Sequence, residues 1–253
     1  MRSFDDLISE ALHADTSGWG FGFLDGRSSE ERPPWGYAKL LAARLATVNS
    51  ALDLDTGGGE VLNEAAILPP RMAVTESWPP NAARAKELLR DRGVDVVQSE
   101  PGLPLPFPSN SFELVTSRHP VAPYWTEIYR VLEPGGTYFA QHVGPASAFE
   151  LIEFFLGPQP EARKGRDPLT EMTEATAAGL VIEDLKTARC RMTFNDIGAV
   201  VWILRKCIWW VPGFEENFAN HLPKLWELDA RLRGGQPFIA HSTRHLVTAK
   251  KPA

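Results

Sequence analysis

Short apolar runs alternate with amphipathic segments through the middle of the chain. The apolar runs predict strands, because each is four to seven residues long and is bounded by Gly, Pro or polar residues. They cover residues 50–55, 71–77, 94–99, 112–118 and 137–143. The segments between them have apolar residues at helical spacing, as in the stretch 81–93, which follows Pro79-Pro80. Strands that alternate with helices predict a parallel sheet with helices on both faces.

The flanks of this pattern are less regular. Residues 37–47 predict a helix. Residues 181–187 and 238–252 predict two further strands, so the expected sheet has seven strands. Two later helices are expected between those last strands, with Asn195 as the N-cap of the first and Pro223 bending or breaking the second. Ser147 is a further candidate N-cap. We therefore expect one α/β domain over residues 1–253. Its parts are an N-terminal helical lid (1–48), a core (49–145) and a C-terminal half (146–253) with a helical insertion at about 194–234.

Composition and charge limit which partners, metals and cellular location are expected. The 253 residues are 43% hydrophobic and 23% charged, with a formal net charge of −6. That charge argues against a broad nucleic-acid interface. The two cysteines have no metal-site spacing and are expected as reduced thiols, and the histidines show no metal-binding motif. With no signal-like N-terminus and no long apolar segment, the predicted location is the cytoplasm, without membrane contact and with a homodimer left open.

The stretch ALDLDTGGGE at 51–60 carries the first chemical signal. A strand that ends in glycines lets backbone approach a ligand at the carboxyl edge of the sheet. A dinucleotide site requires Gly-x-Gly-x-x-Gly, but counting from Gly57 the third glycine is replaced by Leu62. A nicotinamide-dependent oxidoreductase is therefore disfavoured.

The alternative pattern is acidic-x-Gly-x-Gly-x-Gly, which residues 53–59 fit except at Asp55. Here the chain resembles the class I S-adenosylmethionine-dependent methyltransferases. LPLPFPSNSFELV, at 103–115, is similar to the loop and fourth strand of that family. EIYRVLEPGGTYFAQ, at 127–141, is similar to the family's helix, turn and fifth strand. The resemblance extends over about residues 48–145.

The resemblance implies a Rossmann-like, doubly wound sheet and S-adenosylmethionine as cofactor, with S-adenosylhomocysteine as product. Glu76, 23 positions after Asp53, corresponds to the acid that binds the ribose hydroxyls. Glu100 corresponds to the residue that meets the adenine amino group. The expected cofactor-binding residues are Asp53, Asp55, Thr56, Gly57, Gly59, Glu76, Ser77, Glu100, Pro101 and Arg118. At Asp55 two effects remain open, because its carboxylate can accept from the cofactor's amino group or repel its carboxylate.

The acceptor site is less defined. His119 follows the fourth strand of the core and is the candidate catalytic base, or else a histidine that bonds backbone. In the family that the chain resembles, a leading segment often covers the pocket, so the resemblance implies a lid in the aromatic and charged 18–37 segment. The expected substrate-binding residues are Trp19, Arg27, Trp35, Tyr37 and His119. The alternative is that these aromatics only bury the N-terminal segment.

These features predict an S-adenosylmethionine-dependent methyltransferase acting on a small molecule. Two alternatives stay open: a methyltransferase acting on RNA or protein, and a non-catalytic protein that binds the cofactor. No metal is expected.

Overall fold

The computed structural model describes residues 2–17, 20–100 and 104–253, and the chain forms two compact units. We call them the sheet unit and the helical unit. The sheet unit comprises Pro33–Gly144, Arg166–Ala188 and Arg244–Ala253. The helical unit comprises Met1–Arg32, Pro145–Gly165 and Arg189–Thr243.

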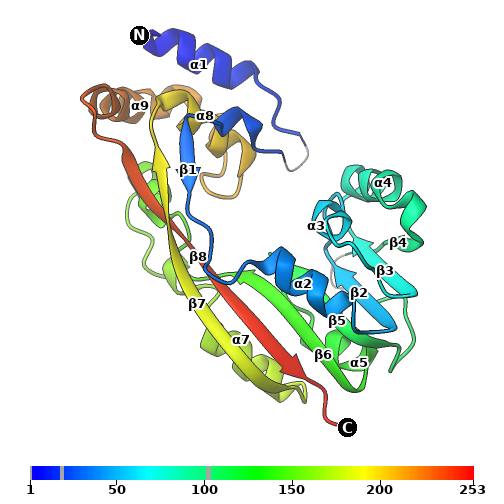
Figure 1. Ribbon diagram of the computed structural model, residues 1–253. Helices are drawn as coiled ribbons and strands as arrows, with labels where there is room; N and C mark the ends of the chain where they lie inside the picture. Colours follow the sequence, from blue (N-terminus) through cyan, green and yellow to red (C-terminus); the bar gives the residue numbers. More distant parts are fainter. Residues whose placement is uncertain (1, 18–19, 101–103) are drawn as a thin grey trace. The chain divides into compact units, whose positions relative to one another are not determined.

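The sheet has eight strands in the order β1-β7-β8-β6-β5-β2-β3-β4 (Figure 1). Their bounds are β1 Ser28–Glu30, β2 Ser50–Leu54, β3 Arg71–Glu76, β4 Val94–Gln98, β5 Phe112–Arg118, β6 Leu132–Val143, β7 Val181–Phe194 and β8 Phe238–Lys250. Strands β4, β3, β2, β5 and β6 pair in parallel, and β8 pairs antiparallel with β6. The α/β class and the mostly parallel sheet are confirmed. The count of seven was wrong by one, because β1 is three residues of SSE with no apolar pattern, yet it pairs with β7.

Helices cover both faces of the sheet unit. Neighbouring residues of one strand enter different cores, as Ala51 and Leu52 of β2 do. One core takes apolar side chains from α2 (Tyr37–Leu45) and α3 (Glu60–Asn63), and the other from α5 (Trp125–Val131) and α7 (Pro168–Ala177). Because side chains alternate along a strand, a strand buried on both faces is mostly apolar, and β2 is buried at every position with Ala51, Leu52 and Leu54 as its apolar residues.

Local chemistry explains the helix boundaries. α4 (Pro79–Leu88) begins with proline in its first turn, where the missing N–H costs nothing, and a short helix, η2 (Arg90–Arg92), follows it. α7 is capped by Asp167, whose carboxylate accepts from the Thr170 N–H.

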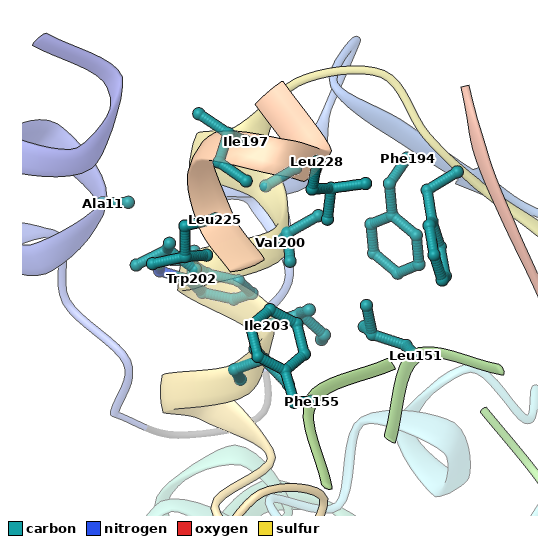
Figure 2. Packing of buried hydrophobic residues seen from close by; sticks show 14 of the residues in the cluster. Ala11, Leu151, Phe155, Phe194, Ile197, Val200, Trp202, Ile203, Leu225 and Leu228 are labelled. Carbon is teal, nitrogen blue, oxygen red and sulfur yellow. The ribbon is translucent and has the colours of Figure 1, made fainter. Parts of the chain in front are cut away.

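The helical unit contains α1 (Phe4–His13), α6 (Phe149–Leu156), α8 (Ile197–Lys206) and α9 (Phe218–Arg233). It also contains two short helices, η1 (Gly22–Leu24) and η3 (Ala162–Lys164), together with β1 and parts of β7 and β8. Trp202 and its neighbours on α8 form the centre of its core, with residues from α1, α6 and α9 around them (Figure 2). α8 is buried on every side, which explains its continuous apolar sequence.

Three expectations in this unit were wrong in detail. Asp196 caps α8 in place of Asn195, through the Ala199 N–H. Ser147 does not cap α6, because its hydroxyl accepts from the Thr243 N–H. α9 continues through Pro223, so the part of the expectation in which this proline breaks the helix was wrong. The helices between β7 and β8 occupy the predicted place in sequence, but their role as an insertion remains a prediction, as does the lid.

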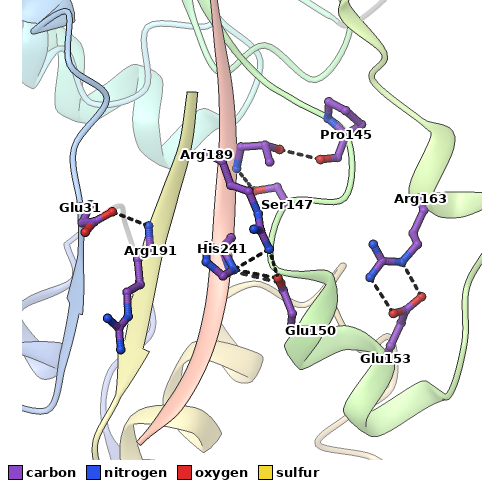
Figure 3. A network of polar contacts seen from close by, with 10 residues as sticks. Glu31, Pro145, Ser147, Glu150, Glu153, Arg163, Arg189, Arg191 and His241 are labelled. Atoms are coloured by element: carbon purple, nitrogen blue, oxygen red, sulfur yellow. Dashed lines mark hydrogen bonds and ion pairs between the residues drawn. The ribbon is translucent and has the colours of Figure 1, made fainter. Parts of the chain in front are cut away.

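Ion pairs link strand and helix within the helical unit. Glu150 of α6 accepts from Arg189 at 2.9 Å and from the His241 ring at 2.8 Å (Figure 3). Glu153, one turn later, pairs with Arg163 through both carboxylate oxygens. Both cysteines, Cys190 and Cys207, are buried free thiols, as expected. No helix in the described ranges is long and apolar enough to cross a membrane.

Candidate functional site

The candidate site lies in the sheet unit, where β2, β3 and β5 end. Because these strands are parallel, the residues that follow them meet at one edge of the sheet. The turn at residues 55–59 follows β2, residues 77–78 follow β3, and His119 follows β5.

The turn after β2 requires left-handed backbone at three positions. Asp55, Gly57 and Gly59 have φ values of 53°, 66° and 82°. Asp is among the few non-glycine residues that adopt this conformation readily, which explains how it replaces the expected glycine. At Gly59 a Cβ atom would lie 2.9 Å from Leu89 Cδ1, so this position also requires the absence of a side chain.

The Glu76 carboxylate is held against this turn. Its Oε2 accepts from the Gly57 N–H and its Oε1 accepts from the Trp78 N–H, both at 2.8 Å. The side chain is 6% exposed. Each carboxylate oxygen retains a lone pair after these bonds, so two further donors, such as a pair of hydroxyls, can still bind.

Two more carboxyls at the end of β2 resist ionisation. Burial raises the pKa of Asp53 to about 6, against the opposing hydrogen bonds from Thr116 and Thr56. Burial, and then repulsion by Glu76, raise the pKa of Asp55 to about 6. A cationic ligand at this point would relieve that repulsion, so the turn is suited to a positively charged molecule.

A pocket opens beside the turn. Among the residues that line it are Asp55, Ser77 and Glu100, three of the predicted cofactor residues, which come from the ends of three successive strands. Its empty volume, which includes space open to solvent, is about 420 Å³. Thr56, Gly57 and Glu76 are held by the same turn but do not line the pocket.

His119 is held in a hydrogen-bonded chain. The Trp35 indole donates from Nε1 to Gln141 Oε1 at 2.7 Å, and Gln141 Nε2 lies 2.9 Å from His119 Nε2. An indole N–H only donates, so the amide must present its NH₂ to the imidazole, and His119 Nε2 accepts. This leaves Nδ1 as the N–H of a neutral ring. Burial first, and then Arg244, Arg118, His142 and Arg166, hold the pKa of His119 well below its usual value.

Tyr37 and Arg27, two predicted substrate residues, are both engaged within the protein. The Tyr37 hydroxyl donates to the Ser117 carbonyl at 3.0 Å, and its ring stacks on Phe139. Arg27 belongs to the helical unit, where it donates to Glu10 at 2.6 Å. Arg118 ends β5 and is exposed. Trp19 and Pro101 lie outside the described residues.

A buried polar cluster lies on the α5 and α7 face of the same unit. The Tyr138 hydroxyl contacts His142 Nε2 at 2.9 Å, and Glu171 Oε2 lies 2.7 Å from His142 Nδ1 and 2.8 Å from His245 Nε2. Hydrogen bonds to the histidines hold the pKa of Glu171 at about 2 against the effect of burial. Donation by both imidazoles to one carboxylate accounts for these contacts, although the three ligand atoms lie within 4.8 Å of one another, as in a metal site.

Sequence reasoning missed part of the pocket wall. Ser99, Ser117, Tyr124 and Tyr138 line it. Tyr124 is the N-cap residue of α5. No motif marks these residues. Ser99, Ser117 and Tyr124 lie at strand ends or a helix start, which would have indicated them, whereas Tyr138 lies inside β6.

Comparison with known proteins agrees with the geometry. Residues 52–140 match the family model described as a methyltransferase domain. A comparison with curated protein sequences found no match.

Solved structures with a similar fold span most of the chain. The YcgJ protein of Bacillus subtilis is 18% identical with a TM-score of 0.60, over 86% of this chain and 98% of that one. A Bacillus halodurans protein assigned as a methyltransferase is also 18% identical, with a TM-score of 0.57 over 85% and 98%. Geranyl diphosphate C-methyltransferase from Streptomyces coelicolor, solved with Mg²⁺, geranyl diphosphate and S-adenosylhomocysteine, is 14% identical, with a TM-score of 0.52 over 85% and 78%.

The predicted resemblance is thus confirmed, because the matching family model is a methyltransferase domain.

Proposed function

We propose that the protein transfers a methyl group from S-adenosylmethionine to a small-molecule acceptor. The observation that carries this proposal is the pocket in which Asp55, Ser77 and Glu100 meet at the carboxyl edge of the sheet. Carboxylates suit the sulfonium and ammonium charges of this cofactor, and the hydroxyl and carboxylate groups suit its ribose and adenine.

The individual residues have separate roles in this proposal. Glu76 binds the ribose hydroxyls with the lone pairs that its two backbone donors leave free. Asp55 accepts from the ammonium group, and Glu100 accepts from the adenine amino group. Gly57 and Gly59 keep the turn free of side chains, so that backbone approaches the ligand.

The bound cofactor supplies an electrophilic methyl group on a sulfonium. Held by Glu76, Asp55 and Glu100, it would supply this methyl group to the acceptor by in-line displacement, with its sulfur as the leaving group. The protein must therefore align and desolvate the acceptor, and a base is required only if the acceptor loses a proton.

His119 remains the proposed catalytic residue. In the network above, its Nε2 lone pair accepts from Gln141, so the ring can act as a base only when that amide rotates or moves away. As it stands, His119 offers Nδ1–H to the acceptor and positions it.

A second candidate function has the same cofactor without methyl transfer. The [4+2]-cyclase SpnF is among the similar structures, with 17% identity and a TM-score of 0.52, so this fold does not by itself determine the reaction. Transfer to a small molecule is favoured over transfer to RNA by the net charge of −6. Among the similar structures, the Streptomyces coelicolor enzyme was solved with a small acceptor.

Calorimetry with S-adenosylhomocysteine tests the cofactor assignment. We expect binding at about micromolar affinity, weakened at least tenfold by Glu76→Gln and unchanged by Glu87→Gln, an exposed residue of α4. NADH is the second ligand and should give no heat. Equal affinity for wild type and Glu76→Gln would exclude the proposed ribose contact.

Incubation with methyl-labelled cofactor and a metabolite extract then tests the reaction. Label in small molecules supports the proposal. Binding without any transfer favours the second candidate.

A further inference from the structure

Tyr138 and His142 lie on one face of β6. They are four residues apart, and side chains alternate along a strand, so both belong to the face that α5 and α7 cover. In the register of β6 with β8, His142 lies directly opposite His245, and the centroids of the two rings are 4.9 Å apart. Glu171, in the first turn of α7, contacts both imidazoles. Two strands and one helix thus bring four polar side chains together.

The hydrogen bonds within this group have a fixed direction. Hydrogen bonds from the two imidazoles outweigh burial and hold the pKa of Glu171 at about 2, so its ionised carboxylate can only accept. His142 Nδ1 therefore carries the hydrogen that it donates to Glu171 Oε2 at 2.7 Å. Burial lowers the pKa of His142, so the ring is neutral at pH 7 and Nε2 has a free lone pair. The Tyr138 hydroxyl, 2.9 Å from Nε2, donates to it.

This order of groups can remove a proton. In a hydroxyl–imidazole–carboxylate chain the hydroxyl donates to one ring nitrogen, and the carboxylate holds the other in the required tautomer. The carboxylate stays ionised and stabilises the imidazolium that forms when the ring takes a proton. His245 donates from Nε2 to the same oxygen of Glu171 at 2.8 Å, which holds the carboxylate in place.

The Tyr138 end of this chain meets the pocket. Tyr138 lines it together with Asp55, the proposed partner of the cofactor's ammonium group. The Tyr138 oxygen keeps a lone pair after its hydroxyl donates to His142, so a hydroxyl in the pocket can donate to it. Burial raises the pKa of Tyr138 well above its usual value. The phenol therefore stays neutral and passes the proton on, and His142 is the group that holds it.

The pocket also indicates which acceptor this chain serves. Its lining includes apolar side chains, among them Leu105 and Ile128. A neutral phenol offers no charge to hold a carboxylate or an ammonium group, whereas it pairs well with another hydroxyl. His119 cannot take the proton of that hydroxyl in the observed network, because its Nε2 already accepts from Gln141.

We propose that Tyr138 is a catalytic residue that takes the proton of a hydroxyl acceptor, with His142 and Glu171 as the positioning residues behind it. This inference rests on the proposed function and assigns its acceptor class, an uncharged small molecule with a hydroxyl group. The acceptor oxygen bonds to the methyl carbon, and the electron pair of the broken carbon–sulfur bond leaves with the sulfur. The acceptor proton moves to the Tyr138 oxygen as the phenol proton moves to His142 Nε2. The ring releases its proton to water once the product has left.

Nitrogen NMR of the protein without ligands tests the chain independently of activity. At pH 7 we expect His142 as the Nδ1–H tautomer, and Tyr138→Phe should shift the Nε2 resonance because that atom loses its donor. Tyr129→Phe is the matched control and should leave it unchanged, because the Tyr129 hydroxyl makes no hydrogen bond within the described residues. A protonated His142 ring, or its Nε2–H tautomer, would overturn the inference, since neither can accept the proton.

Incubation with methyl-labelled cofactor and a metabolite extract tests the reaction, and we expect label in O-methyl products. Tyr138→Phe should lower the rate at least about 100-fold, as expected for loss of a general base, with unchanged affinity for S-adenosylhomocysteine. His142→Gln should lower the rate similarly. The double variant should lose no more than either single variant, because the two residues act as one chain, whereas two separate structural effects would add. Tyr129→Phe should react as wild type does.

The outcomes separate this inference from the proposed function. Transfer by wild type with an unchanged rate in Tyr138→Phe would overturn the inference alone, and so would label on nitrogen or carbon in place of oxygen. Activity lost with a chelator and restored by Zn²⁺ would assign His142, Glu171 and His245 to a metal in place of the proton chain. No label in any product of wild type would remove the proposed function and this inference with it. Urea unfolding of each variant shows that the fold is intact.

Discussion

Two groups of buried carboxylates in the sheet unit are in opposite electrostatic states. Glu171 lies between two imidazoles, and these hydrogen bonds hold its pKa at about 2. Asp53 and Asp55 are buried without a basic hydrogen-bond partner, and both have a pKa raised to about 6. The first arrangement is complete within the protein and stabilises it. In the second arrangement, ionisation of the two carboxyls costs free energy. A bound cation would lower that cost, so the arrangement is typical of a cation-binding site.

Glu171→Gln is expected to have the largest effect on this contrast. A neutral amide accepts from one imidazole and faces the other with a donor, so the free energy of unfolding should fall by about 2–4 kcal/mol. Urea unfolding at pH 7 measures it. Glu174→Gln, exposed on the same helix, should change it by less than about 0.5 kcal/mol. Equal stability of the two variants would contradict the structural role of Glu171.

Asp55→Asn is expected to raise the free energy of unfolding. Asn tolerates the φ of 53° and carries no charge. The free energy of unfolding of the unliganded protein at pH 8 should therefore rise by about 2 kcal/mol. Its affinity for S-adenosylhomocysteine should fall about tenfold, because the ammonium loses its carboxylate. A gain in stability with unchanged affinity would remove Asp55 from the cofactor site.

The pH dependence of stability distinguishes the same two groups. A carboxyl whose folded pKa is raised loses its contribution as pH rises, here from about 3.8 to about 6 for Asp53 and Asp55. Glu171 has a lowered pKa, so its contribution is present above about 4.5 and is lost as pH falls towards 2. Urea unfolding from pH 3 to 8 should show a falling limb between 4 and 6 that is shallower in Asp55→Asn.

Gly59→Ala tests the turn itself. Its φ of 82° and the contact with Leu89 should lower the free energy of unfolding by about 1–2 kcal/mol. Gly93→Ala shares the positive φ, 69°, but meets no atom within 4 Å, so it measures the backbone cost alone. If Gly93→Ala is the more destabilised of the two, close packing at Gly59 is not the constraint.

Trp35→Phe should have the smallest effect on stability, below about 1 kcal/mol. Without the indole donor the Gln141 amide is free to rotate, so His119 should populate both neutral tautomers. Nitrogen NMR shifts of the ring report this directly. Trp78→Phe, a half-exposed residue whose indole makes no hydrogen bond in the described structure, is the control. A single unchanged tautomer in Trp35→Phe would refute the proposed chain.

Elements with a local sequence pattern were predicted, and an element that forms only by pairing with a distant strand was missed. β5 was placed at residues 112–118, as observed, because FELVTSR lies between a polar loop and His119-Pro120. β1 was missed because SSE has neither apolar residues nor β-branched ones, and pairing with β7 alone makes it a strand.

The candidate site shows the same distinction between residues that a local motif places and residues that only the sheet brings together. Asp55, Ser77 and Glu100 line the pocket, and strand ends and motif spacing fix their positions in sequence, while their role in cofactor binding stays a prediction. The hydrogen-bonded chain from Trp35 through Gln141 to His119 joins residues up to 106 positions apart. Only the strand order of the sheet brings such residues together, and that order cannot be derived from a single sequence.

The two backbone amides on Glu76 have a thermodynamic consequence for recognition. A glutamate free to sample its rotamers would have to be immobilised by each arriving nucleoside, whereas this one is immobile before any ligand comes. The entropy of ordering that side chain is spent once, during folding, and each association is correspondingly more favourable.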